Sequence, residues 1–245
     1  MTRDWMMVSR LMGALERNCR TCTVAAFAWL LFCAPAFSAE AETPSQKDIV
    51  AGLKQALTQS AKAAADRLGV TDGFLGNPKV KIPLPGALQK VEGVMRTLGM
   101  SKHPDNLIAA MNRVAEKATA EATPLLVEAV DNMPVEDAGK ILADGDDAAT
   151  RYFRNATSEE LAQKFLPVVK EATSQVGLMK KYNDFAGKAA KLGLVAEKDA
   201  QIENYVTQKA LDGLFLIMAE EERAIRSDPG NQASELLRKV FGSVK

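Results

Sequence analysis

Cysteine, tryptophan and histidine are scarce in this chain. Its 245 residues include three Cys, two Trp and one His. All the Cys and Trp residues precede residue 34, at Trp5, Cys19, Cys22, Trp29 and Cys33. Protein zinc sites are built mainly from Cys and His, so residues 34–245 cannot form a zinc site of that kind. We therefore expect no metal centre, no cofactor and no disulfide in that part.

The first 39 residues have the pattern of a secretory signal. A basic region is followed by an apolar run from Val24 to about Phe37 and then by small residues up to Ala41, the order typical of an export signal. The run is shorter than the roughly 20 residues of a membrane-spanning helix. We predict a signal peptide over 1–39, cleavage after Ala39 or Ala41, and a protein exported to the periplasm or cell envelope. The long basic region leaves four alternative starts: Met1, Met6, Met7 and Met12.

Two alternatives for the N-terminal segment remain open. The signal could stay uncleaved and retain the protein at the membrane. Leu30-Leu31-Phe32-Cys33 also loosely resembles a lipoprotein signal, which would leave a lipid anchor at Cys33, although Phe32 stands where a small residue is usual. No stretch after Phe37 is apolar enough to span a bilayer once the signal is removed.

The charge balance argues against a nucleic-acid partner. Without residues 1–39 the chain keeps 27 basic and 29 acidic residues. Proteins that bind nucleic acid carry a clustered basic face, and no such cluster is present. The remaining length suits one domain with a sizeable core.

Apolar residues recur at helical spacing along most of the chain, which predicts a single all-α domain, a multi-helix bundle over 49–242 after a short linker at 40–48. Gly177 and Gly193 are expected to end helices, and Pro124 and Pro167 to kink or end theirs. The predicted helices cover residues 46–67, 87–98, 103–132, 135–143, 178–191, 200–226 and 233–241, with another beginning at Thr157.

Residues 71–86 are the least helical segment. Pro78, Pro83 and Pro85 disfavour helix there. A flexible linker would not carry five large apolar residues. We therefore predict an ordered, extended, proline-rich loop that packs these side chains onto helices: Phe74, Leu75, Val80, Ile82 and Leu84.

Three acidic or capping patterns predict local structure. Asp144 to Asp147 form a turn in which Asp147 caps the next helix and pairs with Arg151 at i,i+4 spacing. A calcium loop would need an acid at its twelfth position, which is Asn155. The sequence from Thr157 to Glu160 matches a capping box. Glu220-Glu221-Glu222 reads as a solvated helix face, with Glu222 paired to Arg226.

Three blocks of sequence carry a family resemblance. They are Asp72–Leu75 with Asn77-Pro78 and Lys81–Pro85, Gly145–Arg154 with Thr157–Leu161, and Tyr205–Phe215 with Glu220–Glu222. The chain resembles the bacterial family described as domain of unknown function 4197, from about Ile49 to Gly242. That family is found in exported or envelope-associated proteins and has no established activity, cofactor or catalytic residue. The resemblance thus implies fold and location.

The turn of helix from Arg151 to Arg154 carries two cations and two aromatic rings. Arginine binds carboxylate or phosphate through two parallel hydrogen bonds, so this turn is a candidate site for an anionic ligand. Alternatively, Tyr152 or Phe153 belongs to the core and the arginines pair with acids. The full set of candidate ligand-binding residues is Asp146, Asp147, Arg151, Tyr152, Arg154, Lys209 and Asp212.

These patterns favour a non-catalytic exported helical protein that binds a partner protein or a small apolar or anionic ligand. A glycan-cleaving hydrolase that uses carboxylates alone is a second hypothesis. The scarcity of aromatic faces argues against it, because after residue 39 the chain has no Trp and only Tyr152, Tyr182 and Tyr205. An N-terminally anchored membrane-surface protein is a third.

Overall fold

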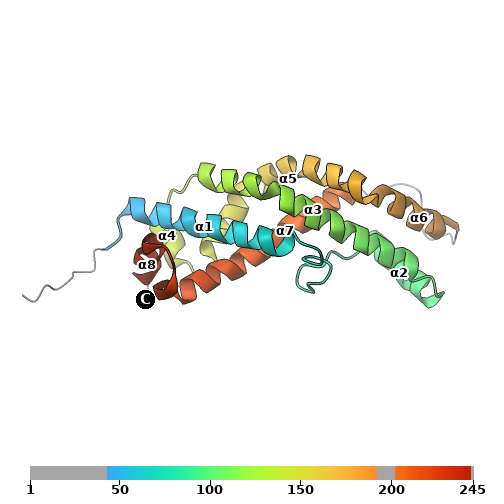
Figure 1. The fold of residues 1–245 in the computed structure, drawn as a ribbon, viewed down its shortest axis with the longest axis horizontal. Helices are drawn as coiled ribbons and strands as arrows, with labels where there is room; N and C mark the ends of the chain where they lie inside the picture. The colour runs from blue at the N-terminus through green and yellow to red at the C-terminus, as the bar shows by residue number, and fades with distance from the viewer. Residues whose placement is uncertain (1–42, 192–201, 244–245) are drawn as a thin grey trace, which may run out of the picture. The chain divides into compact units, whose positions relative to one another are not determined.

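The structure is a computed structural model that describes residues 43–191 and 202–243. The predicted signal, and the predicted helix ends at Gly193 and Ala200, lie outside these residues. The described residues form eight α-helices and one 3-10 helix without a strand, which confirms the all-α prediction (Figure 1). The helices are α1 (Gln46–Leu68), α2 (Gly86–Thr97), α3 (Lys102–Asn132), α4 (Ala138–Ala143), α5 (Ala148–Val176), α6 (Leu178–Lys191), α7 (Ile202–Ser227), η1 (Pro229–Asn231) and α8 (Glu235–Gly242).

Four long helices, α1, α3, α5 and α7, surround the core. Helix α3 packs against α1, α5 and α7, and α7 also packs against α1 and α5. Each of the four buries one stripe of apolar side chains, as the helical spacing predicts. The largest fully buried side chains include Phe74, Phe153, Phe165 and Phe185. Burying such surface is the main contribution to the stability of the bundle.

The two helix prolines do not end their helices. Pro124 lies inside α3, which has 31 residues, and Pro167 lies inside α5, which has 29. Proline removes one backbone hydrogen bond from a helix, and the packed faces on both sides keep these helices continuous. Gly177 does separate α5 from α6, as predicted. Its φ of +70° is a left-handed conformation that glycine adopts without strain.

The capping box predicted at Thr157 is wrong, because α5 begins nine residues earlier, at Ala148. Thr157 is buried inside the helix, and its hydroxyl donates to the Phe153 carbonyl at 2.7 Å. A threonine in a helix interior commonly makes this bond to the preceding turn. Glu160 is exposed and pairs with Lys164 at 3.0 Å. The residues Thr157 to Glu160 match the sequence pattern of a capping box, but they lie in the interior of α5.

The proline-rich loop between α1 and α2 is ordered and packed, as predicted. Phe74, Val80, Ile82 and Leu84 are buried, and Leu75 is half-buried. Two polar side chains of α3 hold the backbone of the loop. Asn112 accepts from the Ile82 amide at 2.8 Å and donates to the Ile82 carbonyl at 2.9 Å. Glu116 accepts the amides of Phe74 and Leu75, both at 3.1 Å.

Candidate functional site

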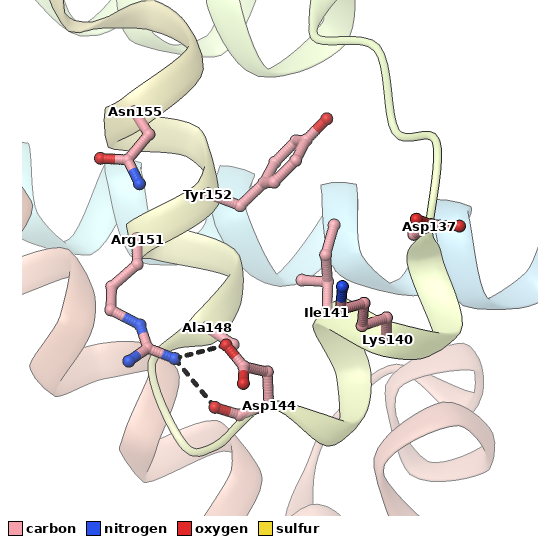
Figure 2. A pocket seen from close by; sticks show the side chains of 8 residues that line it. All are labelled: Asp137, Lys140, Ile141, Asp144, Ala148, Arg151, Tyr152 and Asn155. Carbon is pink, nitrogen blue, oxygen red and sulfur yellow. Dashed lines mark hydrogen bonds and ion pairs between the residues drawn. The ribbon is translucent and has the colours of Figure 1, made fainter.

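A pocket of about 450 Å³ lies where α4 meets the first turns of α5. Figure 2 shows its two walls, one from α4 and its flanking residues and the other from α5. The lining combines both signs of charge with an apolar floor and a tyrosine ring. Its residues are Asp137, Lys140, Ile141, Asp144, Ala148, Arg151, Tyr152 and Asn155.

Arg151 reaches from α5 across the turn that precedes it. Its Nη2 atom donates to the Asp144 carbonyl oxygen at 2.8 Å and to the Asp144 carboxylate at 3.0 Å (Figure 2). Its Nε atom lies 3.3 Å from the Asp147 carboxylate, the i,i+4 pair that the sequence predicts. The Arg151 and Asp144 side chains are 54% and 70% exposed. Such exposed pairs contribute only about 0–1 kcal/mol to stability.

The aromatic residues beside Arg151 have different environments. The Tyr152 hydroxyl donates to the Pro134 carbonyl at 2.9 Å, while its ring packs against the core and lines the pocket. Phe153 is fully buried, and its ring meets that of Phe215 edge to face with centroids 5.9 Å apart. One turn of α5 therefore supplies both a core anchor and a pocket wall.

The α4 wall of the pocket carries two exposed charges, Asp137 and Lys140. Neither side chain makes an ion pair with any residue that the structure describes. Between the walls, Ile141 and Ala148 are only 8% and 4% exposed and provide the apolar floor.

A buried carboxylate fixes the α5 side of the pocket. Glu222 of α7 is fully buried and accepts from the Ala149 amide at 3.1 Å and from the Thr150 amide at 2.7 Å. The Thr150 hydroxyl also donates to it, at 2.7 Å. These bonds satisfy amides of the first turn of α5, which have no partner within the helix. The solvated face predicted for this residue is therefore wrong.

Arg226 completes this buried group and connects it to two more elements, α4 and α8. Its Nε atom donates to Glu222 at 2.8 Å, the i,i+4 pair predicted from the sequence. Its Nη1 atom donates to the Leu142 carbonyl of α4 at 2.8 Å, and its guanidinium lies over the Phe241 ring of α8, 5.0 Å from the centroid. The Glu222–Arg226 pair thus holds both walls of the pocket in place.

The sequence does contain a signal for the burial of Glu222. The buried residues of α7 that lie in helical phase with it include Leu214, Phe215, Met218 and Ile225. A glutamate on an apolar stripe is expected to have a buried partner, because an unpaired charge is costly to bury. Because Glu220 and Glu221 stand directly before Glu222 in the sequence, the run of three acids was interpreted as a solvated helix face.

The remaining predicted site residues lie along the contact between α5 and α7. Arg154 donates to Asp212 at 2.7 Å and lies over the Phe215 ring, 5.6 Å from its centroid. Lys209 also approaches Asp212, at 3.6 Å. Asp212 therefore faces both cations, and none of the three residues lines the pocket.

The predicted group of seven residues is thus divided. Arg151 and Tyr152 line the pocket, and Asp147 is bound to Arg151 and to Arg223 of α7. Asp146 is exposed in the turn before α5. The pocket residues on α4, Asp137 and Lys140 among them, were not predicted, because no spacing in the sequence connects them to Arg151.

A second, more open hollow of about 600 Å³ lies on the outer face of α1. All its lining residues except Asp131 come from that one helix, and Lys54 already donates to the Asp131 carbonyl at 2.6 Å. It has no opposing wall comparable to that of the α4–α5 pocket. We therefore take the α4–α5 pocket as the candidate site.

Within residues 43–191 and 202–243, no cluster of three or more His, Cys, Asp or Glu side chains could hold a metal ion. None of the helices described there is both long and apolar enough to cross a bilayer.

The sequence matches a known protein family. The model of the family described as "Protein of unknown function (DUF4197)" matches residues 43–242. No curated protein and no solved structure matches the chain.

Proposed function

The chain belongs to the DUF4197 family of proteins of unknown function, and we propose its function from the geometry of its pocket. It is an exported, non-catalytic helical protein that binds a small molecule between α4 and α5. The observation that carries this proposal is the pocket itself, which combines two facing walls, an apolar floor and polar groups that make only exposed contacts. Small-molecule sites typically have this combination, in volumes of about 300–1,000 Å³.

The rigidity of the pocket backbone supports binding. Glu222 fixes the first turn of α5, and Arg226 holds the Leu142 carbonyl at the end of α4. A site that is already formed loses less conformational entropy when its ligand binds. The long side chains of Arg151 and Lys140 are the exposed cations of the pocket lining.

The carboxylates of the pocket favour binding over catalysis. Glycan-cleaving enzymes use a pair of acids, one of which is sheltered from water to act as a general acid. Asp137 and Asp144 are both exposed. The buried acid nearby, Glu222, is already bonded to two amides, a hydroxyl and an arginine.

Export is supported by where the family match begins. The family model matches from residue 43, just after the predicted cleavage sites at Ala39 and Ala41. Ser45 caps α1 from this position: its hydroxyl accepts the Asp48 amide at 3.1 Å, and its own amide donates to the Asp48 carboxylate at 3.1 Å. Cleavage at either site would leave this cap intact.

The test is native mass spectrometry of the protein purified from its own cell envelope, with the denatured intact mass measured alongside. We expect a chain that starts at Glu40 or Glu42, and an added mass in the native spectrum that is lost on denaturation. Replacing Arg151 by Gln should reduce the fraction of protein that carries this mass. The matched control is Arg238→Gln, because Arg238 is an exposed arginine of α8 outside the pocket.

Two results would contradict the proposal. Protein without any added mass, in both wild type and control, would mean that the pocket holds no small molecule. A chain that keeps its N-terminal segment, or carries a lipid at Cys33, would replace the exported protein with an anchored one.

A further inference from the structure

We propose that the ligand of the α4–α5 pocket is a small zwitterion, an amino acid or short peptide, whose carboxylate binds Arg151 and whose ammonium group binds Asp137. This inference rests on the function proposed above. The pocket is lined by two residues of each charge: Asp137 and Asp144, Lys140 and Arg151. A ligand that carries both signs matches such a lining, whereas a ligand of one sign meets a like-charged pair.

The carboxylate end is assigned by Arg151. A guanidinium group is a planar fork that fits a carboxylate with two parallel hydrogen bonds. In the structure Arg151 Nη2 already donates hydrogen bonds to Asp144 of the same chain, to its carboxylate at 3.0 Å and to its carbonyl oxygen at 2.8 Å. The Asp144 side chain is largely exposed, so an arriving carboxylate can displace it at little cost. Asp144 is therefore a built-in competitor for the ligand.

The ammonium end is assigned by Asp137. Its carboxylate stands on the α4 wall, and Figure 2 shows it across the pocket from Arg151. No ion pair engages this carboxylate among the residues that the structure describes. It is thus free to accept an amino group.

The middle of the pocket suits the rest of such a molecule. Ile141 and Ala148 form a buried apolar floor for a short side chain. The Asn155 amide both donates and accepts hydrogen bonds, as does the peptide group of a short peptide. The tyrosine ring of Tyr152 covers one side.

The first experiment titrates the protein at low ionic strength with alanyl-alanine, with its N-acetyl form and with its C-terminal amide, by isothermal calorimetry. Free alanine serves as a fourth probe and separates an amino acid from a peptide as the ligand. We expect the zwitterionic forms to bind, and each form that lacks one charge to bind at least about tenfold more weakly, since each loses a charge-assisted hydrogen bond.

Three variants assign the two ends. Arg151→Gln should weaken the dipeptide and its N-acetyl form alike. Asp137→Asn should weaken the dipeptide but leave the N-acetyl form unchanged. Asp144→Asn should tighten the dipeptide about two- to fivefold, because an exposed competing pair is removed. The control is Asp105→Asn, which breaks the exposed Arg96–Asp105 pair of 2.6 Å outside the pocket and should change nothing.

The zwitterion assignment is overturned if capped and uncapped dipeptides bind equally, or if Asp144→Asn fails to tighten binding. It is also overturned if the mass released from envelope-purified protein lacks either a carboxylate or an amine, and in that case the proposed binding function still stands. Empty protein that also binds no probe would overturn both.

Discussion

Two buried glutamates act as caps for segments that lie far away in sequence. Glu222 holds the first turn of α5, and Glu116 holds the amides of Phe74 and Leu75 in the loop. Each is also paired with an arginine on its own helix: Arg226 lies 2.8 Å from Glu222 and Arg113 lies 2.6 Å from Glu116. In both cases the carboxylate replaces water as the partner of buried amides, which would otherwise be unsatisfied.

Removing the Glu222 carboxylate should strongly destabilise the protein. Glu222→Ala leaves Arg226 and two amides buried without their acceptor, and breaking a buried pair in this way costs about 3–5 kcal/mol. Glu222→Gln keeps an acceptor oxygen and should cost less, about 1–3 kcal/mol. Urea unfolding at neutral pH measures the free energy in each case.

Glu221→Ala is the matched control, because Glu221 is the adjacent residue and is 33% exposed. Surface changes of this kind usually stay within about 0.5 kcal/mol. Equal losses for the Glu221 and Glu222 variants would show that the buried cap does not carry the stability assigned to it.

Local spacing predicted residue contacts well only where both partners share a helix. The Asp147–Arg151 and Glu222–Arg226 pairs follow from i,i+4 spacing and are present. The bond from Glu222 to the Ala149 amide joins residues 73 positions apart, which no local pattern can reveal. Asp147 is the N-cap residue of α5, as predicted, but its side chain makes no capping hydrogen bond. Glu222 of another helix accepts the first-turn amides instead.

At the scale of elements, α7 and the proline-rich loop are fitted to one another. The Tyr205 hydroxyl donates to the Pro83 carbonyl at 3.0 Å, and Lys79 pairs with Glu220 at 2.6 Å. Between these contacts, Gly213 of α7 lets the loop come close: a Cβ atom there would lie 2.8 Å from Phe74 Cε1. A side chain at this position would therefore collide with a fully buried ring.

Gly213→Ala should destabilise the protein although alanine is the better helix former. The helix gains about 1 kcal/mol from the change, but overpacking a rigid core costs about 1–3 kcal/mol, and at 2.8 Å from the Phe74 ring we expect the larger cost to prevail. Hydrogen exchange should also speed up at the Phe74 and Leu75 amides. Thermal and urea unfolding measure the net change.

Gly93→Ala provides the opposite expectation within the same protein. Gly93 lies in α2 with no atom within 4 Å of a Cβ added there, so alanine should stabilise by about 0.5–1 kcal/mol. If both substitutions stabilise the protein, the close contact between α7 and the loop is not tight in solution.

The element pattern was largely predictable because helical phase is a property of local sequence. The apolar stripes located the long helices, and the prolines with buried Phe74 and Ile82 located the loop. The spacing of apolar residues within one helix could not predict how closely that helix packs against its neighbours. The close approach at Gly213 depends on the loop that faces it, and the α4 wall of the pocket depends on which turn of α5 it meets.

Across the described domain, the three sequence blocks of the family resemblance turn out to be contact partners. Helix α7, which carries the third block, meets the first block at Pro83 and Phe74 and the second at Arg154 and Ala149. Together they hold the loop and the start of α5 on one central helix. The blocks are therefore explained by packing, and the pocket lies at the edge of the second.

The first and last helices of the domain also pack together. Gly52 of α1 lies so close to α8 that a Cβ atom there would be 2.8 Å from Val240 Cγ2. Beside it, Lys239 of α8 donates to the Asp48 carboxylate of α1 at 3.1 Å. Asp48 also forms the capping box of α1 with Ser45. One carboxylate therefore both caps α1 and binds Lys239 of α8.

These bonds make part of the stability of the domain depend on pH. The hydrogen bond from Lys239 lowers the pKa of Asp48, and the bonds from Ser45 lower it further. A carboxyl whose pKa is lower in the folded than in the unfolded state stabilises the fold above its unfolded pKa of about 4. That contribution is lost as the pH falls through the folded pKa.

Asp48→Asn should therefore be less stable than wild type at neutral pH, and the difference should shrink as the pH falls below about 4. Urea unfolding from pH 7 to pH 2 measures it. Lys239→Ala should flatten the same part of the curve, and the double variant should lose less than the two single losses together, because both remove one interaction. A difference that stays constant down to pH 2, or single losses that add fully, would mean that the pair of Asp48 and Lys239 does not join α1 to α8 in solution.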